Sequence, residues 1–301
     1  MSVLIRTSLT AAAACVIAGS AFAADPAWIE PPAPASSAFM GVVEVGGLAR
    51  YAAEYDEGDL EDEDLVGGAY GSFAVWGGSD AILFGLDGYL ELVALEGVSE
   101  DSLTPNFIGV LGAHVGGKFD TAYLGVFGAV GVYPDEDIEV AVTGYAVGIE
   151  GTVDAGMATL FGKVGYAVAG SDEYGIDDEE EGMVGPFVEG GAVFSLSDEL
   201  AVLVSAGFGY SEHFDNTNDP GGYANWGAKL SYALPTEFAL NLTAAYEGYY
   251  AYTEEDEDET IEHSVKLGLS IPFGDGTAKS SLNPLASPVG PFRAGFGSDA
   301  L

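Results

Sequence analysis

The strongest constraint on the fold is a repeated pattern: stretches in which apolar and polar residues alternate are joined in turn by a short connection and by a long acidic one. Strict alternation over several residues is typical of a β-strand with one apolar and one polar face. Twelve such stretches follow one another between residues 41 and 273. The pattern predicts strands at 41–55, 65–76, 81–95, 107–118, 122–133, 141–153, 157–170, 183–194, 200–210, 223–232, 238–252 and 261–273.

The two kinds of connection differ in length and in charge. The connections after the even-numbered stretches are tight and lie at 77–80, 119–121, 154–156, 195–199 and 233–237. Those after the odd-numbered stretches hold thirty of the 48 acidic residues and no Lys or Arg, as in 56–64, 171–182 and 253–260. Antiparallel neighbours place every second connection at the same end, so one end should carry turns and the other acidic loops. An even strand number puts both ends of the strand region on the turn side.

Charged residues within the predicted strands share one parity. In the last stretch Glu262 and Lys266 lie on the polar side, whereas Val265, Leu267 and Leu269 lie on the other. A charge that faces lipid costs about 2–4 kcal/mol near the bilayer midplane, so a membrane barrel would turn such residues into its lumen. The predicted lumen-facing charged residues are Glu44, Arg50, Glu54, Asp87, Glu91, Lys118, Glu150, Lys163, Glu189, Lys229, Glu247, Glu262 and Lys266.

A soluble β-sandwich also alternates apolar and polar residues, so parity alone leaves two fold classes open. Aromatic residues favour the membrane alternative because many fall on or near the outward parity toward strand ends, where interfacial girdles form. They are Trp76, Tyr166, Tyr210, Trp226, Tyr232, Phe238, Tyr250, Tyr252 and Phe273. We therefore expect an all-β protein, a closed antiparallel transmembrane β-barrel of about twelve strands.

The segments outside the strand region have their own compositions. Residues 1–23 combine an early arginine, a short apolar run and small residues before position 24, which predicts a signal peptide cleaved after Ala23. Residues 24–40 are rich in Ala and Pro and predict a periplasmic leader. The barrel is expected at 41–273, and residues 274–301 form a C-terminal tail that contains Pro and Gly.

The last predicted strand carries a recognisable signal. Its sequence HSVKLGLSIPF (263–273) alternates apolar residues and ends in an aromatic, and it resembles the C-terminal assembly signal of Gram-negative outer-membrane barrel proteins. Residues 1–273 as a whole resemble this broad porin-like class. The resemblance implies Sec export, insertion into the outer membrane of a Gram-negative bacterium by the barrel-assembly machinery, and contact with outer-membrane lipid and lipopolysaccharide.

Two features depart from this resemblance. Pro272 interrupts the signal just before its aromatic end, and the tail 274–301 follows a strand that is normally the last. The tail holds Lys279 and Arg293 in a chain with few basic residues. It is either a disordered periplasmic extension or a segment that folds back and plugs an anionic lumen.

Few residues suggest chemistry. The formal net charge of -40 predicts repulsion of nucleic acid and attraction of cations. The acidic loops lack the register of a calcium-binding motif, so we predict no specific metal site, and no sequence feature predicts a cofactor. His114, His213 beside Asp215, and His263 have no partners in a pattern that aligns a catalytic triad, so we predict no catalytic residue and no enzyme. An enzyme would need His114 or His213 within hydrogen-bond reach of an acid and of a nucleophile or water.

The functional expectation concerns the lumen. Mixed wall charges can simply follow from solvation, or they can hold water and set ion preference. We expect a porin-like channel for passive diffusion of small solutes, with a preference for cations, either as a monomer or as a homo-oligomer. The alternative is a non-conducting structural or surface-interaction barrel. An open lumen would favour the channel, and a lumen filled by side chains or by the tail would favour the alternative.

Overall fold

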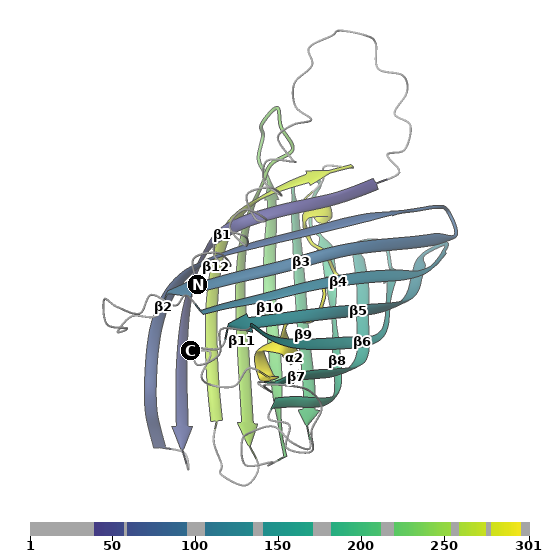
Figure 1. Cartoon of the computed structure of the whole chain (residues 1–301). Helices are drawn as coiled ribbons and strands as arrows, with labels where there is room; N and C mark the ends of the chain where they lie inside the picture. Colours follow the sequence, from purple (N-terminus) through teal and green to yellow (C-terminus); the bar gives the residue numbers. More distant parts are fainter. Residues whose placement is uncertain are drawn as a thin grey trace, which may run out of the picture. The chain divides into compact units, whose positions relative to one another are not determined.

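The structure is a computed structural model that describes residues 39–56, 59–94, 106–134, 141–170, 182–211, 220–253, 259–274 and 278–295. These residues form twelve β-strands that curve into a barrel (Figure 1). The strands are β1 (Phe39–Asp56), β2 (Asp59–Gly78), β3 (Ile82–Ala94), β4 (Asn106–Phe119), β5 (Ala122–Pro134), β6 (Ala141–Asp154), β7 (Ala158–Gly170), β8 (Gly182–Ser195), β9 (Leu200–Ser211), β10 (Gly221–Ala233), β11 (Asn241–Thr253) and β12 (Glu259–Phe273). Each strand pairs with the next, and β1 pairs antiparallel with β12, so the barrel is closed as predicted.

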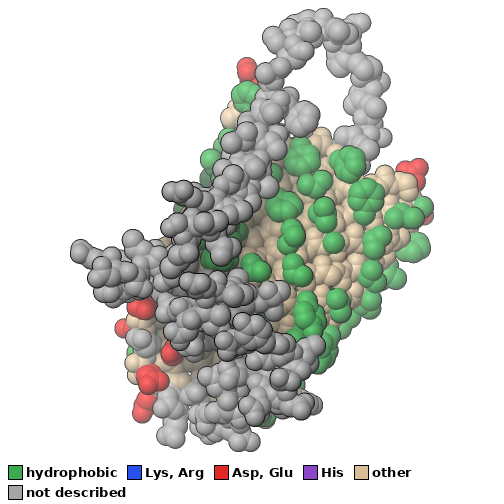
Figure 2. All heavy atoms as spheres, in the orientation of Figure 1, with side chains coloured by type: hydrophobic (Ala, Val, Ile, Leu, Met, Phe, Trp, Pro, Cys, Tyr) green, Lys and Arg blue, Asp and Glu red, His purple; other side chains and the backbone are tan. Residues whose placement is uncertain are grey.

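Side chains alternate between the lumen and the outside along each strand. In β12, Glu262, Ser264 and Lys266 are buried, whereas Val265 and Leu267 are exposed. Hydrophobic side chains spread over the visible outer wall in Figure 2, and acidic side chains appear near its edges. A strand of 13 residues, with a rise of about 3.3 Å per residue and a tilt of about 40°, spans roughly 33 Å, enough to cross an apolar band of about 25 Å. The predicted parity is confirmed.

The turns and loops follow the predicted rhythm where the structure describes them. The connections after β2, β4, β6, β8 and β10 are all described, and they are short. The acidic connections at 95–105, 135–140, 171–181, 212–219 and 254–258 lie outside the described residues, as do the signal peptide and nearly all of the leader. The even strand number places the start of β1 and the end of β12 on the turn side.

Three predicted boundaries are corrected. The first acidic stretch is not a loop of nine residues, because the ladder between β1 and β2 continues to the pair Asp56–Asp59. Backbone pairing needs no apolar side chain, so a hairpin can extend beyond the membrane with acidic residues exposed to water. Strand β11 begins at Asn241 rather than at Phe238, which lies in the preceding connection and is 78% exposed. Strand β1 begins at Phe39, two residues earlier than predicted.

Trp76 is a second kind of correction, because it does not face outward. Its side chain is buried, and its ring centroid lies 5.1 Å from that of His114 inside the barrel. Gly85 on the neighbouring strand leaves room for it, since a Cβ there would lie 2.5 Å from the indole ring. Other members of the aromatic set, such as Tyr166 and Tyr232, are exposed on the outside as predicted.

Pro186 and Pro272 lie at places in the wall where a missing N–H is tolerated. Pro186 in β8 pairs with β7, and the ladder between β8 and β9 ends at the next residue, Phe187. Beyond that point the Ser211 hydroxyl accepts a hydrogen bond from the Val184 N–H at 2.9 Å. Pro272 is the penultimate residue of β12. Both prolines therefore mark the end of a ladder.

The chain after β12 turns into the barrel, where it is drawn in yellow in Figure 1. It forms a short 3-10 helix, η1 (Lys279–Ser281), and a short α-helix, α2 (Gly290–Gly295), which contacts β6, β7, β8, β9 and β10. No helix among the described residues is long and apolar enough to cross a membrane. We refer to residues 278–295 as the C-terminal segment.

Candidate functional site

The C-terminal segment is held near the turn end of the lumen by small polar and apolar contacts. The Ser270 hydroxyl lies 3.0 Å from that of Ser281, and the Asn241 amide donates to the same Ser281 oxygen. Leu282 is 3% exposed and packs against Val193 and Ala201 of the wall. The segment thus enters the lumen beside β8, β9, β11 and β12.

The segment also binds a buried chain of polar groups on β3, β4, β5 and β6. His114 lies between two carboxylates, with Nε2 at 2.5 Å from Asp87 Oδ1 and Nδ1 at 3.0 Å from Glu150 Oε1. The Tyr123 hydroxyl donates to Glu150 at 3.0 Å. Asp87 also accepts hydrogen bonds from Ser287, from the N–H at 2.9 Å and from the hydroxyl at 3.0 Å. The segment therefore supplies donors that this buried aspartate uses.

Two wall lysines make further contacts. Lys163 donates to the backbone carbonyl of Ala286 in the segment, and its Nζ lies 3.9 Å from Glu189. Lys229 reaches across to Glu44 at 2.6 Å. Lys229 on β10 and Glu44 on β1 are thus paired across β11 and β12, which lie between their strands.

The layer nearer the loop end carries the densest set of charges. Arg50 pairs with Glu91 and, at 3.3 Å, with Glu262. Lys266 lies 3.1 Å from Glu91 and 2.5 Å from Glu247. All of these residues belong to the wall, which here provides three acids and two bases.

Arg293 of α2 brings a third base to this layer. Its Nη2 lies 3.3 Å from Glu91 Oε1, and its Nη1 lies 3.3 Å from Glu262 Oε2. Its guanidinium carbon lies 5.9 Å from the centroid of the Tyr249 ring, within the range of a cation–π contact. The segment therefore equalises the number of acids and bases in a layer in which every charged side chain except Glu247 is buried.

The apolar side of α2 packs on the wall. Phe292 is fully buried in a cluster with Phe127, Met183 and Phe187. Gly131 makes room for it, because a Cβ at that position would lie 2.4 Å from the Phe292 ring. The segment is thus seated by shape as well as by charge.

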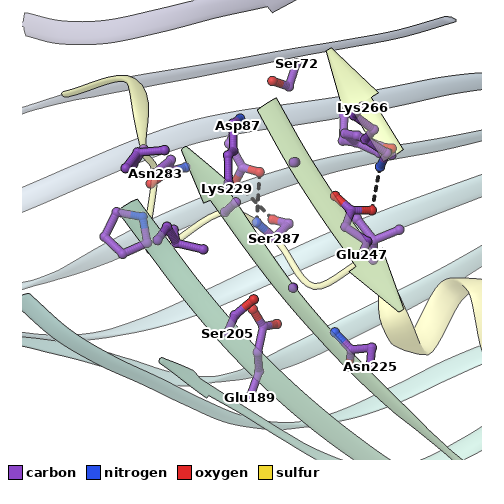
Figure 3. A pocket seen from close by; sticks show the side chains of 18 of the residues that line it. Ser72, Asp87, Glu189, Ser205, Asn225, Lys229, Glu247, Lys266, Asn283 and Ser287 are labelled. Atoms are coloured by element: carbon purple, nitrogen blue, oxygen red, sulfur yellow. Dashed lines mark hydrogen bonds and ion pairs between the residues drawn. The ribbon is translucent and has the colours of Figure 1, made fainter. Parts of the chain in front are cut away.

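A cavity of about 240 Å³ remains beside the segment. Figure 3 shows wall residues Glu189, Asn225 and Glu247 around this space, with Ser287 of the segment bound to Asp87. Arg293 and Tyr249 also line the cavity. It is lined by both signs of charge and by aromatic and aliphatic groups, so it suits a small amphiphilic or charged solute.

The structure places the thirteen charged residues predicted in the wall as follows. Eight are buried inside: Glu44, Arg50, Asp87, Glu91, Glu150, Lys163, Glu262 and Lys266. Glu189, Lys229 and Glu247 are partly exposed and line the cavity. Glu54 is half-buried close to the loop end, and Lys118, although paired with the buried Tyr123, is exposed beside a turn.

The sequence did not predict the contacts of three residues of the site. His114 was named only as a conditional catalytic candidate, Arg293 only as a base in a tail that could plug an anionic lumen, and Ser287 not at all. Arg293 carried a signal, because an isolated base in the tail of a chain with net charge -40 has many candidate partners. The contacts of Ser287 had no such signal, because its separation from Asp87 is 200 residues.

His114 meets half of the stated condition for an enzyme, since it reaches two acids. The nearby Ser287 hydroxyl is bound to Asp87 and has no recorded contact with His114, so the described residues show no Ser–His pair of the triad type. In the described part of the chain, no group of three or more His, Cys, Asp or Glu side chains could hold a metal ion. His213 lies outside the described residues, and His263 stacks against Tyr246 with centroids 6.0 Å apart.

No family model and no curated protein matches this chain. Among solved structures it is similar to an outer-membrane channel from Pseudomonas putida F1, with 14% identity and a TM-score of 0.51 over 83% of this chain and 100% of that one. It is also similar to the translocator domain of the autotransporter NalP from Neisseria meningitidis, with 16% identity, a TM-score of 0.47 and coverage of 88% and 98%. The outer-membrane phospholipase A of Escherichia coli matches with 14% identity, a TM-score of 0.43 and coverage of 75% and 95%. The likeness to the Pseudomonas putida structure shows the fold: the chain forms a closed antiparallel β-barrel of the kind found in outer-membrane proteins.

Proposed function

We propose that this protein is a passive diffusion pore that its own C-terminal segment closes, and that small cationic or neutral solutes cross when the segment leaves the lumen. One observation carries the proposal. The C-terminal segment occupies the lumen, which by the criterion stated above favours the non-conducting alternative for the state seen here. The occupant is nevertheless a separate segment that follows the last strand, and a cavity lined by charged residues of the wall and of the segment remains beside it.

The contacts of the segment support a reversible plug. Several are hydrogen bonds or ion pairs, as at Ser281, Ser287 and Arg293, and water or dissolved ions can take their place once the segment has left and the lumen is hydrated. The segment is joined to the wall through Phe273, so its departure requires no strand to separate from its neighbour. The barrel itself can stay intact.

The wall charges support a cation preference. Eight acids and five bases were predicted on the inward parity, and acids remain in excess when the segment and its Arg293 are absent. A water-filled passage with an excess of fixed negative charge concentrates cations and repels anions. No catalytic role is needed for this function.

A reversible cross-link tests the proposal. An ideal Cβ at Gly112 lies 3.0 Å from the Ser287 Cβ and 2.8 Å from Asp87 Oδ1. The segment and the Asp87 side chain must therefore shift by about half an ångström to reach the Cβ–Cβ separation of about 3.5–4.5 Å that a disulfide requires. The double variant Gly112→Cys with Ser287→Cys, in a chain whose only native cysteine is Cys15, would lock the segment in the middle of the lumen. We expect low conductance in planar bilayers when it is oxidised, and a higher, cation-selective conductance after a reductant is added.

The control is Ser287→Cys alone, whose conductance should not respond to the reductant. If the double variant is inserted and folded, as heat-modifiable migration would show, and yet does not conduct in either redox state, the pore proposal is wrong. That result would favour a permanently closed structural barrel.

A further inference from the structure

Arg293 occupies a place in the lumen that is built for a cation. The wall offers three buried or partly buried acids there, Glu91, Glu247 and Glu262, but only two bases, Arg50 and Lys266. Removing the segment would leave one carboxylate in excess within an enclosed layer. An uncompensated charge in such surroundings is unfavourable, so the layer attracts any cation that can enter.

The arrangement of the acceptors selects for a guanidinium group. Glu91 lies on β3 and Glu262 on β12, and one planar group reaches both at 3.3 Å through two different nitrogens. A compact ammonium offers a point charge instead of a fork and has no flat face for an aromatic ring. The Tyr249 ring lies 5.9 Å from the guanidinium carbon and supplies such a surface.

Arg293 fills this place incompletely. Both of its contacts are longer than the 2.7–2.9 Å that is usual for charge-assisted hydrogen bonds. Its Nε and the Tyr249 hydroxyl are buried and have no hydrogen-bond partner among the described residues. A solute that is not constrained by the backbone of α2 can move to satisfy more of these groups.

The site is also reachable from the residual cavity. Arg293, Tyr249 and Glu247 line the cavity of about 240 Å³, so a small solute can come against the Tyr249 ring and the guanidinium while the segment is still in place. Glu91 and Glu262 do not line this cavity, so the solute reaches them only as Arg293 withdraws. We infer that the Glu91, Glu262 and Tyr249 side chains form a guanidinium-binding site, that Arg293 acts as its internal occupant, and that small solutes with a guanidinium group compete with Arg293 and thereby release the plug. This inference rests on the proposed pore function and names the class of solute that opens the pore.

The test compares two nearly isosteric solutes on the full-length mature protein. L-arginine carries a guanidinium, and L-citrulline carries a neutral urea group of the same shape. In planar bilayers at moderate salt, we expect millimolar arginine to increase the open probability of the wild-type pore and citrulline to leave it unchanged.

Substitution of the internal occupant provides the second arm. Arg293→Met keeps an unbranched apolar stem but removes the charge, and Lys279→Met removes the other base of the segment, for which no ion pair is recorded. A tethered competitor acts at an effective concentration in the millimolar range. We therefore expect calorimetric titration in detergent to show arginine binding about tenfold tighter to Arg293→Met than to the wild type or to Lys279→Met, and no citrulline binding to any of them.

Each result has a distinct meaning. If Arg293→Met conducts but neither binds arginine nor distinguishes it from citrulline, the guanidinium site is wrong and the pore remains. If arginine binds to Arg293→Met as expected but no variant conducts, including the reduced double-cysteine variant, the site is right and the pore function is wrong. If Arg293→Met does not fold, Arg293→Lys replaces it, because an occupant without the guanidinium fork should also give tighter arginine binding than the wild type.

Discussion

A charge placed on the outer wall should destabilise the barrel according to its depth in the membrane. Leu267 is 61% exposed and lies one residue from the middle of β12, which spans Glu259–Phe273. With a rise of about 3.3 Å per residue and a tilt of about 40°, it lies roughly 2.5 Å from the midplane of the wall. Leu196 has nearly the same exposure, 63%, but lies in the turn after β8.

We expect Leu267→Arg to lower the free energy of unfolding in lipid by about 2–4 kcal/mol, and Leu196→Arg by at most about 1 kcal/mol. Since about 1.4 kcal/mol corresponds to a factor of ten, the first variant should shift the ratio of folded to unfolded protein by roughly 30- to 1,000-fold. The assay is reversible urea unfolding in lipid vesicles, followed by tryptophan fluorescence and heat-modifiable migration. Equal effects of the two substitutions would refute the membrane orientation of the wall, because a barrel in water would treat both positions alike.

Two further predictions concern the interior. His114→Ala removes the imidazole between Asp87 and Glu150, whose side chains are almost completely buried. Because breaking such a buried pair costs about 3–5 kcal/mol, urea unfolding should show that the free energy of unfolding falls by this amount. The control, His263→Ala on the outer wall, should show no such fall. Gly148→Ala should also lower the free energy of unfolding in the same assay, because its Cβ would lie 2.3 Å from a backbone oxygen. Gly128→Ala should leave the stability unchanged, because the nearest atoms to its Cβ are 4.0 Å away. If Gly148→Ala is as stable as Gly128→Ala, the steric argument is wrong.

The wall could be predicted from sequence because two independent periodicities agree. Alternation fixes which side of each strand is apolar, and the alternation of turns and loops fixes the direction of successive strands. Boundaries were less predictable where pairing does not depend on burial. The β1–β2 hairpin continues through acidic residues to Asp56 and Asp59, since backbone hydrogen bonds are indifferent to side-chain charge in water.

The occupancy of the lumen was not predictable to the same degree. The C-terminal segment has neither alternation nor helical periodicity, and its placement depends on contacts with residues about two hundred positions away, such as Glu91 with Arg293. The inward orientation of Trp76 was missed for a related reason, because it depends on the space that Gly85 leaves on a neighbouring strand. The sequence around a residue does not indicate which side chains from other strands it will contact inside the barrel.

The position of the C-terminal segment also dictates an order of events during folding. Its contacts involve strands from around the whole circumference, from Asp87 on β3 to Asn241 on β11. These partners converge only when β1 has met β12, a closure that joins residues more than two hundred positions apart, such as Arg50 and Ser264. Contacts of such sequence separation form late, because loop-closure entropy must be overcome first. The segment therefore reaches its final place last. For an interval after insertion, the barrel is closed but its lumen does not yet hold the segment.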